Sequence, residues 1–250
     1  MMFTGKAAMI TGASVGIGRA CALRMAQEGA CLILLDRRLE TLEALREEFL
    51  GQMGTGGSDR LFVRPCDISD EQRVNETVRE AVEKFGRVDI LVNNAALWRC
   101  WTPFLEVPTD EWKRFFDVNV LGTVYCTRAV LGGMLERGYG RIINVGSVAG
   151  VYGNANMVHY SATKGALIAL TKALAKEVAA QGVTVNCVAP GSVSPSEHSD
   201  VTYTEPSQLS FMGRTGSDAE NAALICFLAS DEASYISAQN IQIDGCRRKQ

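Results

Sequence analysis

Short apolar runs alternate with segments of helical periodicity along the 250-residue chain, and this alternation restricts the possible folds more than any other feature. Seven mostly apolar runs are predicted to be strands, at residues 6–11, 30–36, 61–66, 88–93, 141–145, 183–189 and 240–244. Apolar residues recur at helical spacing between them, at 17–28, 40–50, 74–85, 159–180 and 218–229, and a long helix is predicted to begin at Thr109. Repeated strand–helix units with short links form a parallel sheet covered by helices on both faces. The sequence therefore predicts an α/β fold, a doubly wound parallel sheet of about seven strands, in one domain spanning residues 1–250.

One segment, residues 192–213, interrupts this pattern. It is rich in serine, threonine, proline and acidic residues and shows no clear periodicity. An irregular segment of that length inside a compact domain is usually functional. We expect it to be the substrate loop.

The overall composition argues against several classes of protein. Hydrophobic residues make up 47% of the chain and charged residues 21%, as in soluble globular proteins, and the net charge of −3 gives no general attraction to nucleic acid or to an anionic membrane. No apolar run approaches the length of a membrane span, and the first residues do not read as a signal peptide. The eight cysteines are scattered without paired spacing, so we expect reduced thiols, no metal site and a cytoplasmic location.

The link between the first predicted strand and the first predicted helix, residues 11–18, has the sequence TGASVGIG. Its glycines permit a tight turn and a close approach of the backbone to a pyrophosphate, while the start of the helix supplies unpaired N–H groups and a positive dipole. A glycine-rich turn alone is weak evidence, because glycines also serve tight strand–helix joints. Here a strand precedes the turn, a helix follows it, and the second strand ends in an acid, which is the context that a dinucleotide site requires. We therefore expect a Rossmann-type nucleotide site at this turn.

The acid that ends the second predicted strand is Asp36, 18 residues after Gly18. A carboxylate at this place accepts hydrogen bonds from the ribose hydroxyls of NAD and repels the 2′-phosphate of NADP. Arg37 and Arg38 follow, and an arginine there can pair with a 2′-phosphate, although both also fit as solvated charges at a helix start. The position of the acid favours NAD and leaves NADP possible.

Several motifs that follow in order resemble those of the short-chain dehydrogenase/reductase family, in its short single-domain form. They are the glycine turn, Asp67-Ile68, Asn93-Asn94-Ala95, Asn119, Ser147, the pair Tyr160 and Lys164, and Pro190-Gly191. The resemblance covers nearly the whole chain, and the members most like it are 3-oxoacyl reductases and secondary alcohol dehydrogenases. It implies cofactor contacts at Gly12, Ser14, Val15, Gly16, Ile17, Gly18, Asp36, Arg37, Asp67, Ile68, Asn94, Ala95, Tyr160, Lys164, Pro190, Gly191 and Val193.

The chain departs from the family pattern at three further positions. Ala96 replaces the glycine that usually follows Asn-Asn-Ala, and Cys246 replaces the second glycine of a common Asp-Gly-Gly. The threonine that often holds the nicotinamide carboxamide is Pro195 here, so Ser194 or Ser196 would have to replace it. None of these changes removes the residues that carry the reaction, but the changes in the loop leave the substrate undetermined.

Four residues are predicted to carry the chemistry. Lysine at i+4 lies on the same helix face as tyrosine, so Lys164 is expected to favour the phenolate of Tyr160 and lower its pKa, which is ordinarily near 10. Such a pair also occurs by chance on helices. It becomes evidence for an active site because Ser147 ends a predicted strand, which is where doubly wound folds place their sites. Tyr160 would exchange a proton with the substrate oxygen that Ser147 positions, while a hydride passes to or from the cofactor. The resemblance implies that Lys164 also binds the nicotinamide ribose and that the backbone carbonyl of Asn119 holds a water in a proton relay.

The substrate is the least determined part of the prediction. Trp98, Gly153 and Asn154 are candidate substrate contacts, although Trp98 and Trp101 fit equally well as packing of a loop on the body. We expect a small alcohol or ketone as substrate, oxidised or reduced with NAD, with an NADP-dependent 3-oxoacyl carrier-protein reductase as the alternative. A non-catalytic nucleotide sensor on the same fold is a more distant alternative. In such a protein we would expect Ser147, Tyr160 or Lys164 to be lost, and all three are present. The resemblance further implies a homo-oligomer, a tetramer or a dimer, paired through the helices that begin near Thr109 and His159.

Overall fold

The computed structural model describes residues 1–53, 57–194 and 200–248, and its centre is one parallel sheet of seven strands. The order across the sheet is β3-β2-β1-β4-β5-β6-β7, so the chain runs outward from β1 in one direction, returns, and runs outward in the other. The strands are β1 (Ala7–Thr11), β2 (Cys31–Asp36), β3 (Leu61–Pro65), β4 (Ile90–Asn93), β5 (Gly140–Val145), β6 (Val183–Pro190) and β7 (Asn240–Ile243). The doubly wound sheet predicted from the sequence is confirmed.

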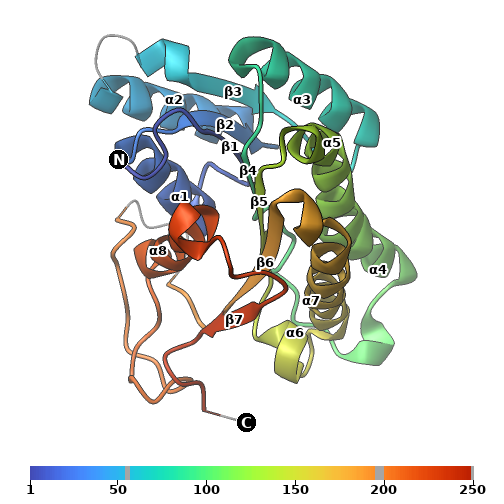
Figure 1. The fold of residues 1–250 in the computed structure, drawn as a ribbon. Coiled ribbons are helices and arrows are strands. Elements are labelled where there is room, and N and C mark those ends of the chain that lie inside the picture. The colour runs from blue at the N-terminus through green and yellow to red at the C-terminus, as the bar shows by residue number, and fades with distance from the viewer. Residues whose placement is uncertain (54–56, 195–199, 249–250) are drawn as a thin grey trace.

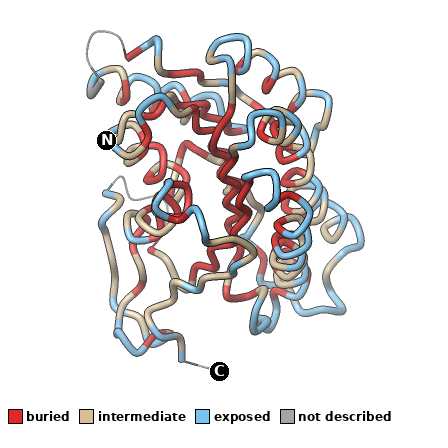
Figure 2. Tube along the Cα trace, in the orientation of Figure 1, coloured by how far each residue is buried: buried red, intermediate tan, exposed pale blue. Residues whose placement is uncertain are grey.

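Helices cover both faces of this sheet (Figure 1). One apolar layer packs α1 (Gly16–Gln27), α2 (Leu39–Met53) and α8 (Asp218–Ala229) on the sheet, and the other packs α3 (Glu71–Phe85), α5 (Gly122–Arg137) and α7 (Val158–Val178). The shorter elements are η1 (Gly57–Arg60), η2 (Phe104–Glu106), α4 (Thr109–Phe116), η3 (Asp117–Leu121), α6 (Ala149–Tyr152), η4 (Ala179–Gln181) and η5 (Asp231–Ala233). The strands between the two layers form the most buried part of the molecule (Figure 2).

Side chains of a strand alternate between the two layers, because successive residues point to opposite faces. In β2, Leu32 and Leu34 belong to the layer of α1 and α8, whereas Ile33 and Leu35 belong to the layer of α3 and α5. All four are fully buried. This two-sided burial explains why the run is almost entirely apolar, as the sequence suggested.

Local signals fix the start of two of the helices and the end of one of them. The Asp70 side chain accepts a hydrogen bond from the backbone N–H of Arg73 and caps α3, and Gly86 ends this helix with a φ of 75°. Ser217 and Glu220 form a capping box at the start of α8, and Arg214 donates to both carboxylate oxygens of Glu220.

The long helix predicted to begin at Thr109 is interrupted by one π-helical stretch, η3, between α4 and α5. The helical segment Thr109–Glu136 is long and apolar enough to cross a membrane, judged by length and composition alone. The sequence did not indicate this, because it contains no unbroken apolar run of that length. Its most apolar window has a mean hydropathy of 1.2, and 39% of that window is buried inside the fold. The core helices of globular proteins meet the same criterion, and α5 packs here in the layer with α3 on β4 and β5.

The predicted substrate loop and the end of the chain lie against each other. Residues 195–199 of the loop are outside the described residues, and the remainder is held by short bridges, Val193 to Gly216 and Pro206 to Arg214. A third bridge joins Ser210 to Arg247, which lies beyond β7. The end of the chain is held against the loop as far as Arg248, whose backbone N–H donates to the carbonyl of Leu209.

Candidate active site

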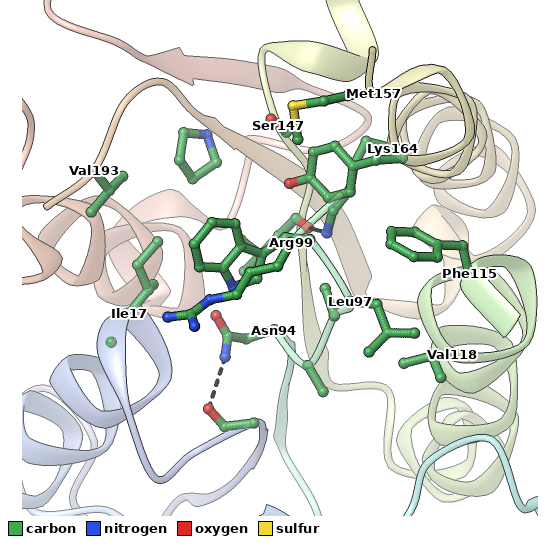
Figure 3. A pocket seen from close by; sticks show the side chains of 18 of the residues that line it. Ile17, Asn94, Leu97, Arg99, Phe115, Val118, Ser147, Met157, Lys164 and Val193 are labelled. Atoms are coloured by element: carbon green, nitrogen blue, oxygen red, sulfur yellow. Dashed lines mark hydrogen bonds between the residues drawn. The ribbon is translucent and has the colours of Figure 1, made fainter. Parts of the chain in front are cut away.

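A cleft of about 1520 Å³ runs along the carboxyl edge of the sheet. It crosses the point where the strand order reverses between β1 and β4, which is where doubly wound folds bind their ligands. Figure 3 shows Ser147, Lys164 and Met157 gathered at one end of the drawn pocket and Ile17 and Val193 toward the other. The predicted site residues that line the cleft are Gly12, Val15, Gly16, Ile17, Asp36, Arg37, Asp67, Ile68, Asn94, Ala95, Trp98, Ser147, Asn154, Tyr160, Lys164, Pro190, Gly191 and Val193.

The glycine turn between β1 and α1 has the geometry of an anion cradle. Gly12 and Gly16 adopt φ values of 63° and 59°, a region that other residues rarely occupy. A Cβ on Gly18 would lie 2.6 Å from Nδ2 of Asn94, so this glycine permits the helix to approach the sheet closely. Val15 precedes α1 and gives no side-chain cap, which leaves the first-turn N–H groups of the helix to an incoming acceptor. This donor set fits the pyrophosphate of a dinucleotide.

Asp36, at the end of β2, is buried and is anchored from within the protein. Its Oδ2 accepts hydrogen bonds from Ser14, from Oγ at 2.5 Å and from the backbone N–H at 3.2 Å. Its Oδ1 accepts from the backbone N–H of Arg38 at 3.1 Å. Ser14 does not line the cleft itself, so its side chain orients the carboxylate that does. Arg37 is exposed at the rim.

The carboxyl ends of β3 and β4 complete this half of the cleft. Asn94 ties β4 to the glycine turn, because its Nδ2 donates to the carbonyl oxygens of Thr11 and Gly12, each at 3.0 Å. Asp67 accepts two hydrogen bonds from Ser69 at its Oδ1. Partial burial acts to raise the pKa of Asp67, but these hydrogen bonds and the charges of Arg37 and Arg114 together outweigh it and hold the pKa below its usual value.

Ser147, Tyr160 and Lys164 meet at the other end of the cleft. Ser147 lies just after β5, and the other two lie one turn apart on α7. The Nζ of Lys164 lies 5.7 Å from the centre of the Tyr160 ring and donates to the carbonyl oxygen of Val145 at 2.7 Å. A Cβ on Gly150 would lie 2.5 Å from the carbonyl carbon of Lys164, so this glycine lets α6 pack directly on α7 at the lysine.

The pKa values of these groups differ from the sequence-based expectation. Burial raises the pKa of Tyr160 to about 12, while a hydrogen bond with Ser147 acts in the opposite direction. Burial also lowers the pKa of Lys164 to about 8. The expected lowering of the tyrosine pKa by the lysine is therefore not seen, because the loss of water around the phenol has the larger effect and the ammonium is directed to Val145.

Asn119 lies in the π-helical stretch η3 and does not line the cleft. Its side chain fastens the loop after β4, because Oδ1 accepts from the N–H of Leu97 at 2.7 Å and Nδ2 donates to the Leu97 carbonyl at 3.0 Å. The same Nδ2 donates to Oγ1 of Thr163, beside Lys164 on α7. Its backbone carbonyl accepts from Oγ1 of Thr123 at 3.1 Å. The proton-relay role implied by the resemblance stays a prediction.

The lining of the cleft outside the predicted cofactor contacts is mixed, with apolar side chains such as Leu97 and Phe115 and charged ones such as Glu111 and Arg114. Trp98 and Trp101 meet edge to face with their ring centres 6.1 Å apart, and both are exposed at the mouth. Asn154 lines the cleft, whereas Gly153 lies outside its lining, so a substrate contact by Gly153 stays a prediction. Ser194, one of the two candidates to replace the missing threonine, is buried with its hydroxyl 2.7 Å from that of Thr215. The other candidate, Ser196, lies outside the described residues.

Two features of the cleft were not identified from the sequence. Arg247 lines it from beyond β7 and donates to Oδ1 of Asn154 at 3.0 Å, a contact between residues 93 positions apart that no local motif signals. Asp218, at the start of α8, also lines it, and burial raises the pKa of this carboxyl to about 6. Within residues 1–53, 57–194 and 200–248, no three histidine, cysteine or acidic side chains come together as metal ligands.

Comparison with known proteins agrees with this geometry. A model of the short chain dehydrogenase family matches residues 6–205. The 3-oxoacyl-[acyl-carrier-protein] reductase FabG of Thermotoga maritima is 38% identical, over 98% of each chain. The 2-dehydro-3-deoxy-L-rhamnonate dehydrogenase (NAD(+)) of a Sphingomonas species is 36% identical, over 98% of this chain and 96% of its own length.

Solved structures give the same result. An NAD⁺-bound xylitol dehydrogenase superposes with a TM-score of 0.88 at 31% identity and covers 98% of this chain and all of its own. A levodione reductase also has a TM-score of 0.88, at 32% identity, with 97% of each chain covered.

Proposed function

The chain belongs to the short-chain dehydrogenase/reductase family and is an oxidoreductase of CH–OH and C=O groups, and from this premise we propose that it interconverts a secondary alcohol and a ketone with NAD as the preferred cofactor. The family uses a nicotinamide cofactor, which supplies the hydride chemistry when bound. The observation that carries the proposal is the cleft that joins the glycine turn and Asp36 at one end to Ser147, Tyr160 and Lys164 at the other.

The proposed mechanism assigns one task to each side chain. The Ser147 hydroxyl donates a hydrogen bond to the substrate oxygen and fixes its position. Tyr160 exchanges a proton with that oxygen at its Oη. A phenol with a pKa of about 12 is protonated at neutral pH, which supports carbonyl reduction with Tyr160 as the acid. Lys164 lies beside the phenol and is held by the Val145 carbonyl, so it fits a role in binding the cofactor ribose.

The preference for NAD is inferred from Asp36. Its carboxylate faces the cleft and is fixed by Ser14 and by the backbone of Arg38, so it cannot turn away from a ribose without losing these hydrogen bonds. A 2′-phosphate would meet this negative charge. Among the relatives and solved structures, the rhamnonate dehydrogenase and the xylitol dehydrogenase are named with NAD⁺.

We predict that Asp36→Asn shifts the cofactor preference toward NADPH. The substitution keeps the size of the side chain and removes the charge that repels the 2′-phosphate. The ratio of kcat/KM for NADH to that for NADPH is expected to fall by about tenfold or more, since a hydrogen bond to a charged group contributes about 1.5–3 kcal/mol. Initial rates measured with both cofactors test this. Tighter binding of NADPH than NADH by the unmodified enzyme would overturn the proposed cofactor.

We predict that Tyr160→Phe lowers kcat by about 10²- to 10⁴-fold, the usual contribution of a positioned acid or base. Binding of NADH, followed by its fluorescence, should change little, because the ring remains in place. The assay uses NADH absorbance with a panel of ketones and secondary alcohols. Full activity in the variant would exclude Tyr160 as the acid.

A 3-oxoacyl carrier-protein reductase is the second candidate, favoured by the 38% identity to the Thermotoga reductase. The resemblance to such reductases implies basic residues that meet the carrier protein at the positions of Gly132 and Gln181, and both of these residues are uncharged here. NADPH-dependent reduction of a 3-oxoacyl thioester faster than of a free ketone would favour this candidate.

The remaining assignments are also proposals. We propose one domain with residues 192–213 as its substrate loop, a homo-oligomer paired through α4, α5 and α7, and a cytoplasmic location. The oligomeric state is tested by light scattering, in which a monomer at working concentration would contradict the pairing.

A further inference from the structure

Arginines line the cleft at several points, and the structure shows a nearby carboxylate for some of them. The Nε of Arg38 lies 3.8 Å from Oδ1 of Asp36. The charges of Arg37 and Arg114 both act to lower the pKa of Asp67. Within the described part of the chain no carboxylate forms an ion pair with Arg247, and its guanidinium donates to the amide oxygen of Asn154 instead.

The backbone holds Arg247 at the substrate side. Gly245 and Cys246 both have positive φ values, 61° and 58°, and turn the chain back after β7. The returning segment pairs with the loop through the backbone. The N–H of Phe211 donates to the carbonyl of Cys246 at 2.9 Å, and the N–H of Arg248 donates to the carbonyl of Leu209 at 3.0 Å. These contacts place Arg247 and Leu209 together in the lining of the cleft.

Asn154 fixes the guanidinium from the opposite wall. The Oδ1 of Asn154 accepts from Nη2 of Arg247 at 3.0 Å. Asn154 is itself held by Ser161 of α7, whose Oγ accepts from the Asn154 backbone N–H at 3.2 Å. Asn154 lies between Ser147 and Tyr160 in the sequence, and all three residues line the same cleft. A guanidinium has five N–H donors, and its contact with Asn154 leaves donors for a second acceptor.

We propose that Arg247 binds a carboxylate of the substrate, so that the enzyme acts on oxo- or hydroxycarboxylic acids. The inference rests on the proposed function, in which the reacting carbonyl lies at Ser147 and Tyr160. A planar guanidinium matches a carboxylate with two parallel hydrogen bonds, and a charge that has no ion-pair partner in the described part of the chain and lines the same cleft as Ser147 and Tyr160 favours an anionic ligand. The substrate then spans the cleft, with its carbonyl at Tyr160 and its carboxylate at Arg247.

The test compares acids with their neutral methyl esters. Acetoacetate, 4-oxopentanoate and 5-oxohexanoate place the carboxylate at increasing distances from the carbonyl. With NADH in excess, kcat/KM for at least one acid should exceed that of its ester by about tenfold to a hundredfold. In Arg247→Met the preference should disappear, chiefly through a higher KM for the acid, with the ester unchanged. Arg247→Lys should restore part of it.

Arg248→Met is the matched control. Arg248 is the next residue, is exposed, and lies over the ring of Phe211 at 4.9 Å, so its substitution should leave the acid preference intact. Equal kcat/KM for acids and esters in the unmodified enzyme would overturn the inference. Equal losses for acid and ester in Arg247→Met would do the same, because they indicate that Arg247 only holds the chain end in place.

A binding measurement separates this inference from the proposed function. Malonate is expected to quench the tryptophan fluorescence of the protein, through Trp98 and Trp101 at the mouth of the cleft, and Arg247→Met should weaken its binding by about tenfold or more. If no ketone, acid or ester is turned over, the proposed function fails while the malonate titration still decides the role of Arg247. Inorganic phosphate binding more tightly than malonate at Arg247 would reject a carboxylate in favour of a phosphate.

Discussion

Lys164 carries its charge where water is nearly absent, with 3% of the residue exposed. Burying an ammonium destabilises the fold, and the lowered pKa of about 8 reflects this cost. The hydrogen bond to the Val145 carbonyl offsets part of it. Active sites often contain residues that reduce stability but are needed for activity, and Lys164 beside Tyr160 fits this description.

We predict that Lys164→Met abolishes activity without lowering stability at pH 7. Below pH 8 the lysine is charged in both the folded and the unfolded protein, so the full cost of burial applies. Between pH 8 and pH 10.5 the unfolded chain binds more protons, so the stability of the unmodified protein rises with pH. The advantage of the variant in unfolding free energy should therefore shrink between pH 7 and pH 10, by at most about 3 kcal/mol.

Urea unfolding of both proteins at several pH values measures this difference. Lys172→Met provides the control, since Lys172 is exposed on the same helix and its substitution removes a lysine that the fold does not bury. A difference between Lys164→Met and the unmodified protein that stays constant from pH 7 to pH 10 would contradict the prediction.

At the scale of elements, the contact of α6 with α7 sets the position of Tyr160 and Lys164. The two helices meet at Gly150, where an added Cβ would lie 2.5 Å from the carbonyl carbon of Lys164 and 2.7 Å from the nitrogen of Gly165. Both of these atoms belong to the backbone, so no side chain can move to make room. The helix that carries the proposed acid is therefore held in place by a residue that has no side chain.

We predict that Gly150→Ala forces α6 and α7 apart, costs about 1–3 kcal/mol of stability and lowers kcat more than it weakens NADH binding. Gly132, inside α5, is the matched control, because a Cβ added there would meet nothing within 4 Å. Gly132→Ala should stabilise the protein by about 0.5–1 kcal/mol through helix propensity. Thermal unfolding and initial rates measure both variants, and equal stability of the two would refute the packing argument.

At the scale of the whole molecule, the cleft joins strands from both halves of the sheet, so cofactor binding should stabilise the entire fold. At about 100 times its Kd, a ligand that binds only the folded protein adds about 2.7 kcal/mol. For a chain of this length that corresponds to a rise in Tm of roughly 5–10 °C. We predict such a rise with NADH and a smaller one with NADPH at the same concentration. Differential scanning calorimetry measures both, and an equal rise with the two cofactors would count against the role proposed for Asp36.

Most of the fold could be predicted from the sequence, because buried strands and amphipathic helices leave periodic patterns. The two-sided burial of residues 32–35 is visible as an unbroken apolar run, and the glycine turn is visible as a motif. The π-helical stretch around Asn119 could not be predicted, since it is one irregular turn within an otherwise helical pattern. The contact of Arg247 with Asn154 could not be predicted either, because it depends on how two loops far apart in the sequence meet.

The strand order also has a consequence for synthesis on the ribosome. Counting from β1, each strand that emerges adds to a free edge of the sheet already formed: β2 and β3 on one side, then β4 to β7 on the other. No pairing that has been made has to open again for a later strand to enter. The cost is that one edge of β1 stays unpaired until β4 has been made, some eighty residues later, and an unpaired edge invites association with other chains. Protection of the nascent chain is therefore needed most during the synthesis of α1 to α3, before the two halves of the cleft exist together.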